Sequence, residues 1–537
     1  MSESSDIGAA PQSSGAGVDR RWLAAAVAAI TLGGLLLRLS SFDDPLLDDE
    51  LSTYFIASAS GLGGAIDLVR SDLEVTPPLY FALAWLTEGL GDPAIGLRLW
   101  PMLAGLATIP LTALLGTWTV GRRAAIVAAL IVALSPFLIL ESADARAHPV
   151  MLVLVLVSTL ALVRAVGGGR TGWWVAYAAF SCAAIWTHYT CVFVLAGQFA
   201  WAFLLFPKAR PALIASNVAV AIGYLPWLVT GFPEDQSSPG NLIEILHPFG
   251  IESAGTDLAR WSIGQPYVPL DSVPGDIAVA IFLAGLAVAA VGVLLAVRAA
   301  GDRAGWRPSD GLLLVIVLAL ATPVGEVLYS IVIGSLLTPR NLIASWPGLA
   351  LALGALVSAP AKPLRIAATA LVVGAFAIGA VMMLDADNQR PDYDAAAEYI
   401  EASGDPDAPV IEQPYSSNPL SPLEVSLNDP GRSIHQRHPV YRVGTPTRRA
   451  QERARDEGLP PVARLPAPTT EELGRKAASR ARGGELFVVT PEPPASLPID
   501  YVGPILEAIP SRLEEIDRRE FPGVRRVTVR VFRVRPR

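Results

Sequence analysis

The sequence has few charged residues and few cysteines for its length. Of its 537 residues, 17% are charged, against roughly 25% in an average soluble domain. The two cysteines, Cys182 and Cys191, lie inside hydrophobic segments, and neither CxxC nor Cys/His zinc spacing occurs. The net charge is -8, and no dense Lys/Arg block is present. These shortages argue against a disulfide scaffold, a zinc module and a nucleic-acid-binding protein, because phosphate contacts need clustered cations.

Long apolar runs, in contrast, recur from residue 22 to residue 384, and 52% of the chain is hydrophobic. Runs long enough to cross about 30 Å of hydrocarbon predict a polytopic, mainly α-helical membrane protein with 11 spans. We expect them near 22–40, 96–118, 123–141, 147–165, 172–187, 190–206, 211–231, 276–298, 311–335, 341–357 and 363–384. The 15-residue segment 77–91 begins with two prolines and predicts an interfacial helix in the first outer loop, with Tyr80, Phe81, Leu83, Ala84 and Trp85 available to face acyl chains.

The distribution of cations predicts the orientation, because short loops rich in Lys and Arg stay in the cytoplasm. With eleven spans, one side of the membrane holds residues 20, 21, 122, 123, 164, 170, 208, 210, 298, 303, 307, 362 and 365, all Lys or Arg. The opposite side holds few cations: Arg70, Arg146, Arg260 and Arg340 lie in its loops, and Arg38 and Arg98 lie near helix ends. We therefore expect a cytoplasmic N terminus and an extracytoplasmic segment after the last span.

Three regions follow from these patterns: a disordered cytoplasmic tail (1–21), a transmembrane domain (22–384) and an extracytoplasmic soluble domain (385–537). In the last region, 393–403 has helical spacing, 484–491 is typical of a buried strand, and 525–534 alternates like a terminal strand. We therefore predict a C-terminal α/β domain.

Acidic residues gather on the predicted outer side. Asp48, Asp49 and Glu50 stand within one turn just beyond the first span, and Glu74 and Asp144 lie in outer loops. Like charges this close raise one another's pKa unless a cation offsets them. Solvated loop residues remain the alternative for each of these acids, but so many on one face favour a functional site.

Seven stretches resemble the GT-C superfamily of polyprenyl-phosphate-sugar-dependent glycosyltransferases, in the branch of bacterial protein O-mannosyltransferase-like and aminoarabinose-transferase-like enzymes (glycosyltransferase family 39-like). They are DDELSTYF (48–55), EVTPPLYFALAWL (74–86), GLRLWPMLAGLATIPL (96–111), SPFLILESADARAH (135–148), WTHYT (186–190), TPRNL (338–342) and RPDYDAAAEYI (390–400). The resemblance implies an integral enzyme of the bacterial plasma membrane with an extracytoplasmic active site. Its partners are the bilayer, a polyprenyl-phosphate sugar and an acceptor that is a protein, a lipid or a cell-envelope glycan.

The resemblance also implies roles for individual residues. Asp49 takes the proton of the attacking acceptor, with Glu50 beside it, and Asp48 is an alternative because the doubled aspartate blurs the alignment by one position. Arg146 and Arg340 are expected to bind the donor phosphate, since arginine suits that anion. Open alternatives are an ion pair of Arg146 with Asp144 or Glu141, and an interfacial anchor for Arg340.

Family members with a divalent metal hold it through acids of the first and second outer loops. In this sequence those acids are Glu74 and Asp144, with His148 as a further candidate ligand for Mg, Mn or Zn. Three positions depart from the family: Thr76 replaces a basic or imidazole side chain, while His148 and Asn341 each replace a tyrosine. These changes bear on the donor sugar and on phosphate binding rather than on the architecture.

Two other function classes compete with the glycosyltransferase. A transporter or flippase of a lipid-linked or anionic solute tends to show repeats and acids within broken helices at mid-membrane, whereas here the acids lie in loops and at helix ends and no repeat is found. A catalytically dead scaffold that binds cell-wall polymer through 385–537 is weaker still, because Asp49, Glu50, Glu74 and Arg146 are all retained.

Overall fold

The computed structural model describes residues 16–71, 74, 76–168, 170–231, 249–266, 272–300, 308–402, 407–413, 420–427, 438–443, 470–481, 484–492 and 502–534. The chain forms two compact units. The first comprises Met1–Ser40, Ile66–Leu83 and Arg98–Met383, and the second comprises Ser41–Ala65, Ala84–Leu97 and Leu384–Arg537. The first loop is thus divided between the units. Residues 1–15 of the expected tail lie outside the described residues, and the first helix begins at Ala16.

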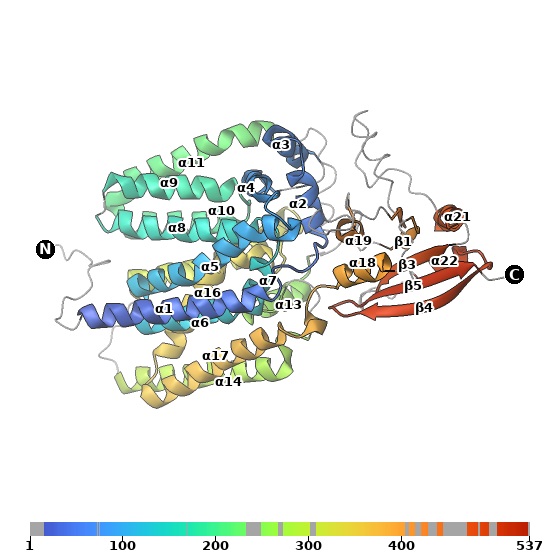
Figure 1. Ribbon diagram of the computed structural model, residues 1–537. Helices are drawn as coiled ribbons and strands as arrows, with labels where there is room; N and C mark the ends of the chain where they lie inside the picture. The colour runs from blue at the N-terminus through green and yellow to red at the C-terminus, as the bar shows by residue number, and fades with distance from the viewer. Residues whose placement is uncertain are drawn as a thin grey trace. The chain divides into compact units, whose positions relative to one another are not determined.

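Helices make up nearly all of the first unit (Figure 1). In chain order the helices up to Met382 are α1 (Ala16–Leu39), α2 (Asp49–Ala57), α3 (Leu62–Arg70), α4 (Leu79–Thr87), α5 (Pro93–Thr119), α6 (Arg122–Leu134), α7 (Pro136–Ser142), α8 (His148–Val166), α9 (Thr171–Ile185), α10 (Cys191–Leu205), α11 (Arg210–Thr230), α13 (Ile251–Ser262), α14 (Gly275–Ala300), α15 (Asp310–Val332), α16 (Trp346–Ser358) and α17 (Lys362–Met382). The described residues also form the short 3-10 turns η1 (Pro207–Ala209), η3 (Asn341–Ser345) and η4 (Ala386–Asn388).

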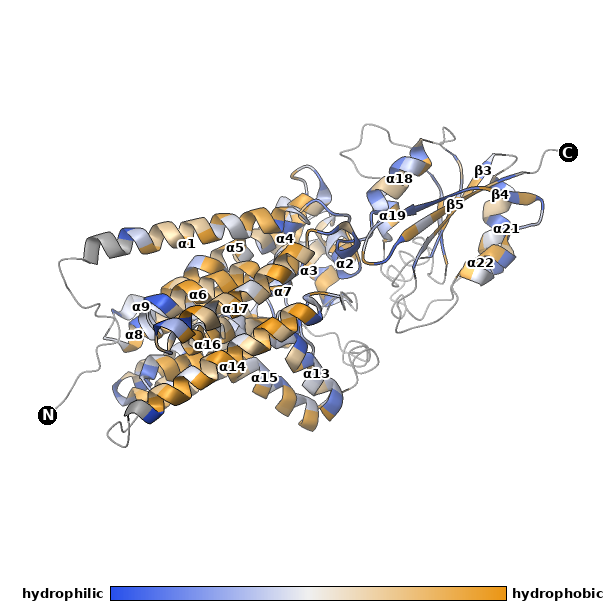
Figure 2. Cartoon of the chain, turned by 90° about the horizontal axis from the view of Figure 1, so that it is seen from below, coloured by the Kyte–Doolittle hydropathy of each residue, from blue (hydrophilic) through white to orange (hydrophobic). Residues whose placement is uncertain are grey.

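Eight of the described helices are long and apolar enough to cross a membrane, and the bent pair α6–α7 makes nine if it counts as one span. Figure 2 shows that hydrophobic residues dominate these helices. Helices α9 and α10 are apolar but have only 15 residues each, fewer than the roughly 20 that a span needs. All eleven predicted segments are therefore helical, but the prediction of eleven spans is two more than helix length supports.

The break between α6 and α7 has a local cause and a distant partner. Pro136 lacks an N–H and disfavours helical backbone at the residue before it, so the last carbonyls of α6 lose their helical donors at a bend of 60°. Arg38, fully buried in α1, donates to the carbonyls of Val132 at 3.2 Å and Ala133 at 3.1 Å. It also donates to Ser142 Oγ at 3.1 Å. One buried cation thus satisfies the break and holds the end of α7.

Helix α16 packs against its neighbours through glycines. A Cβ at Gly348 would lie 2.4 Å from Ala319 N of α15, and one at Gly354 would lie 2.5 Å from Ala124 O of α6. Both distances are shorter than van der Waals contact, so only glycine permits these helix backbones to approach so closely. Because η3 leads directly into α16, this packing also fixes the segment that carries Arg340.

The second unit contains a five-stranded mixed sheet in the order β2-β1-β3-β5-β4. Its elements are α18 (Tyr393–Glu401), β1 (Val410–Glu412), α19 (Pro422–Leu427), β2 (Val440–Arg442), α21 (Thr470–Arg480), β3 (Glu485–Pro491), α22 (Val502–Ala508), β4 (Leu513–Phe521) and β5 (Val527–Val534). Strands β2, β1 and β3 are parallel, and β5 pairs antiparallel with β3 and β4. The predicted helix at 393–403 and the strands at 484–491 and 525–534 are confirmed.

The alternation of side chains along β3 gives this sheet two apolar faces. Phe487 and Val489 join a core with α18 and α19, whereas Leu486 and Val488 join a second core with α21 and α22. Since successive side chains of a strand point to opposite faces, the run of buried residues in β3 requires helices on both sides. The C-terminal region is therefore a helix–sheet–helix domain, as the α/β prediction required.

Helix α4 lies inside the segment predicted to be interfacial. Its nine residues are too few to cross the hydrocarbon, which agrees with leaving it out of the span count. The expectation that Tyr80 and Phe81 face acyl chains, however, is wrong. Tyr80 and Phe81 are 0% and 1% exposed, whereas Leu86 is 63% exposed. The nearly uniform hydrophobicity of this helix hides which of its faces is buried.

Candidate active site

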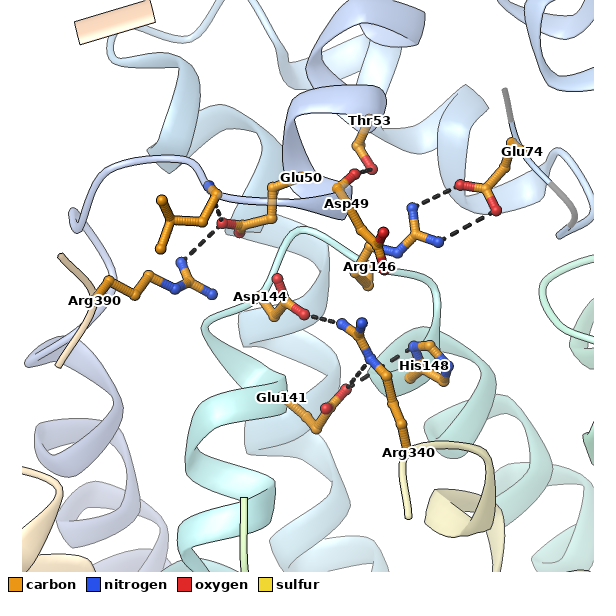
Figure 3. Close-up of polar contacts among 11 residues, drawn as sticks. Asp49, Glu50, Thr53, Glu74, Glu141, Asp144, Arg146, His148, Arg340 and Arg390 are labelled. Atoms are coloured by element: carbon orange, nitrogen blue, oxygen red, sulfur yellow. Dashed lines mark hydrogen bonds and ion pairs between the residues drawn. The ribbon is translucent and has the colours of Figure 1, made fainter. Parts of the chain in front are cut away.

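The connection between α7 and α8 gathers four polar side chains (Figure 3). Glu141 lies in the last turn of α7, Asp144 and Arg146 lie in the connection, and His148 begins α8. Asp144 N donates to Glu141 O at 3.3 Å, and Arg146 N donates to Asp144 O at 2.7 Å. Pro149 near the start of α8 favours helix initiation at this point. The stretch 135–148 thus folds into a compact turn that presents all four residues together.

Arg146 forms a bidentate ion pair with Glu74. Its Nη1 lies 2.6 Å from Glu74 Oε2, and its Nη2 lies 3.2 Å from Oε1. The two side chains are 8% and 4% exposed. Glu74 Oε1 also accepts from the backbone N and Oγ1 of Thr76 at 3.3 and 3.1 Å, and the guanidinium lies 6.0 Å from the centre of the Phe81 ring. Charge-assisted bidentate pairs are directional, so Glu74 fixes the orientation of Arg146.

Arg340 pairs with two acids of the α7–α8 connection. Its Nε donates to Glu141 Oε2 at 3.2 Å, and its Nη2 donates to Asp144 Oδ2. The Arg340 side chain is 10% exposed, so this contact is largely shielded from water. One alternative considered from the sequence is therefore corrected, because Arg340 belongs to a buried network with Asp144 and Glu141 and is not a simple interfacial anchor. For Arg146 the structure gives Glu74 as an ion-pair partner, a pairing that was not among the alternatives.

Two buried histidines stack beside these ion pairs. The ring centroids of His148 and His188 are 4.5 Å apart. His148 Nδ1 lies 3.9 Å from Glu141 Oε2, which is too long for a hydrogen bond, and His188 Nδ1 lies 2.9 Å from Thr190 Oγ1. Burial, with a smaller effect of the positive Arg146, lowers the pKa of His188 to about 3. This imidazole is therefore neutral at physiological pH.

The candidate metal ligands Glu74, Asp144 and His148 do not form a ligand set in the described part of the chain. Both oxygens of Glu74 contact Arg146, and Asp144 contacts Arg340. No group of three or more His, Cys, Asp or Glu side chains among the described residues is arranged to hold a metal ion. A divalent cation needs several ligands at about 2.0–2.6 Å, and guanidinium groups already neutralise these acids. The residues therefore do not fit the expected metal.

The predicted catalytic acids Asp48, Asp49 and Glu50 lie at the start of α2, within the second unit. Asp48 occupies the N-cap position, and Glu50 is 1% exposed with its Oε2 accepting from Leu47 N at 3.2 Å. Asp48 reaches solvent, yet the surrounding chain desolvates its carboxyl. This desolvation and the neighbouring Asp49 charge raise the pKa of Asp48 to about 6. A carboxyl in this range suits a general base near neutral pH.

Three further residues belong to these clusters: the sequence placed none of them among the candidate site residues and named Glu141 only as an alternative partner of Arg146. Glu141 binds Arg340, His188 stacks on His148, and Arg390 lies with its Nη1 3.0 Å from Glu50 Oε2. His188 and Arg390 stand in stretches that resemble the family, WTHYT and RPDYDAAAEYI, which was the available signal. Nothing in the sequence pairs any of them with its partner.

The family comparison bears directly on the first of these clusters. Residues 75–233 match the sequence model described as "Dolichyl-phosphate-mannose-protein mannosyltransferase". Over this segment the chain is similar to that glycosyltransferase family. The resemblance stated from the sequence motifs is therefore confirmed here, and the matched segment includes Asp144, Arg146, His148 and His188. No curated protein is significantly similar in sequence.

Some solved structures resemble nearly the whole length of this chain. ArnT from Cupriavidus metallidurans bound to undecaprenyl phosphate is 14% identical with a TM-score of 0.50, and the match covers 95% of this chain and 98% of that one. The same enzyme in the apo state gives 17% identity, a TM-score of 0.40 and coverages of 96% and 98%. The archaeal oligosaccharyltransferase AglB from Archaeoglobus fulgidus is 13% identical with a TM-score of 0.42, and the match covers 88% of this chain and 70% of that one. The first of these likenesses supports an ArnT-like fold.

Proposed function

We propose that this protein is an inverting glycosyltransferase that moves a sugar from a polyprenyl-phosphate donor to an acceptor outside the cytoplasm. The observation that carries the proposal is the buried cluster in which Arg146 and Arg340 meet the α7–α8 connection. Buried arginines in a membrane enzyme need an anionic partner, and a lipid phosphate at the membrane surface is an anion that arginine binds well. The matched family segment and the fold shared with an undecaprenyl-phosphate-bound ArnT support this assignment.

The chemistry assigns a role to each group. As the acceptor hydroxyl or amine attacks the anomeric carbon, its proton passes to the Asp49 carboxylate, and the bond from that carbon to the phosphate oxygen breaks. The electron pair leaves with the polyprenyl phosphate, and attack from the opposite face inverts the anomeric centre. Arg146 and Arg340 stabilise the charge that develops on the departing phosphate, because charge-assisted hydrogen bonds strengthen as the acceptor becomes more negative.

The proposed orientation has the N terminus in the cytoplasm of a bacterium and the active site and residues 385–537 outside its plasma membrane. It requires α9 and α10 to cross the bilayer as short spans, giving eleven crossings with the bent pair as one. A shorter hydrophobic helix can do so where the bilayer thins or flanking residues snorkel. Reporter fusions after Lys208 and after Pro391 should report opposite compartments, and the same compartment for both would refute the eleven-crossing topology.

A transfer assay tests the proposed reaction. Purified protein is incubated with a panel of polyprenyl-phosphate sugars and native envelope extract, and products are identified by mass spectrometry. Asp49→Asn should lower turnover about 10²- to 10⁴-fold because it removes a proton acceptor with little change in shape. The matched variant Asp48→Asn decides between the adjacent aspartates, since the base is the one whose loss has this effect. Full turnover in both variants would refute a general base in this segment.

One observation favours a second candidate, a transporter or flippase. Glu326 lies inside α15, so the expectation that the acids lie in loops and at helix ends fails for this residue. It is 0% exposed, and neither carboxyl oxygen has a hydrogen-bond partner among the described residues. Acids buried in membrane helices often mark solute or proton pathways. Proteoliposomes separate the two functions: a transporter moves labelled polyprenyl-phosphate sugar between leaflets, and Glu326→Gln abolishes that movement, whereas a glycosyltransferase consumes the donor only when an acceptor is present.

A further inference from the structure

The role of the C-terminal domain follows from its contacts with the first loop inside the second unit. We infer that this domain holds the acidic first-loop segment in its working conformation and that Arg390 is the positioning residue, acting through Glu50. The catalytic part of this inference rests on the proposed glycosyl transfer. The structural part, the attachment of the segment, does not.

Arg390 and Glu50 form an almost completely buried ion pair. The Nη1–Oε2 distance is 3.0 Å, and the side chains are 10% and 1% exposed (Figure 3). The same Glu50 oxygen accepts from Leu47 N, and Glu50 N donates to Leu47 O at 2.9 Å. These bonds close a turn around Asp48 and Asp49. Arg390 therefore acts on the two candidate bases without being one of the reacting groups.

This turn is strained and needs support from outside. Asp48 has φ 43°, and it is the one non-glycine residue with positive φ in the described parts of the chain. Such conformations cost on the order of 1–3 kcal/mol and persist where the surroundings impose them. Leu47, next to Asp48, packs against the apolar core that contains Tyr393 of α18 and Phe487 of β3. The C-terminal domain thus supplies both an apolar and an ionic contact to the turn.

Arg390 is itself held by the sheet. Gln389 O accepts from Val524 N at 2.8 Å, and Asp392 N donates to Pro522 O at 3.1 Å, so the β4–β5 connection binds the chain on both sides of Arg390. Gly523 has φ 140°, and a Cβ there would lie 2.5 Å from the Pro391 backbone. This close approach requires glycine and leaves the segment little freedom. The backbone that carries the Arg390 guanidinium is therefore fixed by the β4–β5 connection.

Two arginines of the domain also set the charge around the turn. Asp48 experiences the positive charges of Arg525 and Arg390, which lower its pKa, and the negative charges of Asp49 and Glu50, which raise it together with burial. Removing a positive charge raises the pKa of this group further. If Asp48 is the base, it must be deprotonated to act, so loss of Arg390 should then move the acid limb of the pH–rate profile to higher pH.

The test compares Arg390→Gln and Arg390→Lys with a matched control, Arg533→Gln. Arg533 of β5 forms an ion pair with Glu485 of β3, and the two residues are also opposite each other in the register of these strands. We expect Arg390→Gln to lower kcat about 10- to 100-fold with little change in donor KM, because the base is misplaced while donor binding is retained. The acid limb should move up, Arg390→Lys should recover part of the rate, and Arg533→Gln should behave as wild type.

Hydrogen exchange of residues 45–58 gives a readout that needs no activity. Faster exchange in Arg390→Gln but not in Arg533→Gln supports the attachment, even if the wild-type protein transfers no sugar and the proposed function fails. Unchanged exchange overturns the attachment. If exchange rises but kcat falls no more than in Arg533→Gln, Arg390 is a structural tether alone and the catalytic part of the inference is refuted.

Discussion

The buried pair of Arg146 and Glu74 allows a sharp prediction about donor binding. The cluster contains two guanidinium groups, Arg146 and Arg340, and three carboxylates, Glu74, Glu141 and Asp144. Its formal charge is therefore -1 when all five are ionised. A phosphate that enters must share an arginine with an acid or displace that acid. We expect Glu74 to compete with the donor phosphate for Arg146.

Three variants separate the structural role of Arg146 from its role in binding. Arg146→Ala should destabilise the protein by about 3–5 kcal/mol, because it leaves a buried carboxylate without its partner. The exposures of 8% and 4% mean that water screens this pair only weakly. Glu74→Gln should cost less, since the amide oxygen can still accept from Arg146. The double variant should be more stable than Arg146→Ala, because no unpaired buried charge remains.

Donor affinity should follow a different order. A charge-assisted contact to phosphate contributes about 1.5–3 kcal/mol, so losing Arg146 should weaken binding of undecaprenyl phosphate roughly 10- to 150-fold. Glu74→Gln should tighten binding, because the competing acid is gone. Thermal unfolding midpoints in detergent micelles, measured over a titration of undecaprenyl phosphate, give both quantities, since a ligand that binds the folded state raises the midpoint according to its concentration relative to Kd.

The comparison within the Glu74→Gln background is decisive. In that background residue 74 carries no charge, so adding Arg146→Ala leaves no unpaired carboxylate at position 74. If undecaprenyl phosphate binds the double variant as tightly as it binds Glu74→Gln, Arg146 is only the partner of Glu74, and its assignment to the phosphate is wrong.

Three further predictions concern other parts of the chain. Arg38→Met should lower the unfolding midpoint well below that of the control Arg21→Met, because each carbonyl left unsatisfied at the α6–α7 break costs roughly 1–3 kcal/mol; equal midpoints would contradict the capping role. Burial raises the pKa of Glu412 to about 7, above the roughly 4.3 of an unfolded chain, so the folded state binds this proton more tightly and loses stability as pH rises through this interval. Pulse proteolysis of the full chain should detect that loss, and Glu412→Gln should abolish it; an unchanged slope in the variant would assign the loss elsewhere. Dialysis against EDTA should leave sugar transfer intact because Glu74 and Asp144 are paired with arginines, and activity restored only by Mg, Mn or Zn would refute this.

Local patterns were sufficient to predict where most elements begin and end. Apolar runs located all eleven helical segments of the membrane region, because a chain in lipid must satisfy its backbone polar groups internally and does so as helix. Alternation and short apolar runs located β3 and β5 for a similar reason, since one strand face or both faces must be buried. The lengths of α9 and α10 and the buried face of α4 were missed, because hydrophobicity alone does not distinguish contact with lipid from contact with protein.

Residue types alone identified the acids and arginines of the candidate site, since charged side chains beside membrane helices are costly and therefore indicate function. Their partners depended on the tertiary structure. Arg146 meets Glu74 across 72 positions, Arg340 meets Asp144 across 196, and Arg390 meets Glu50 from the C-terminal domain. An ion pair depends on distance and burial in three dimensions, and any acid of the first two outer loops satisfied the sequence equally well. Only the packing of the folded chain decided which charge each arginine neutralises.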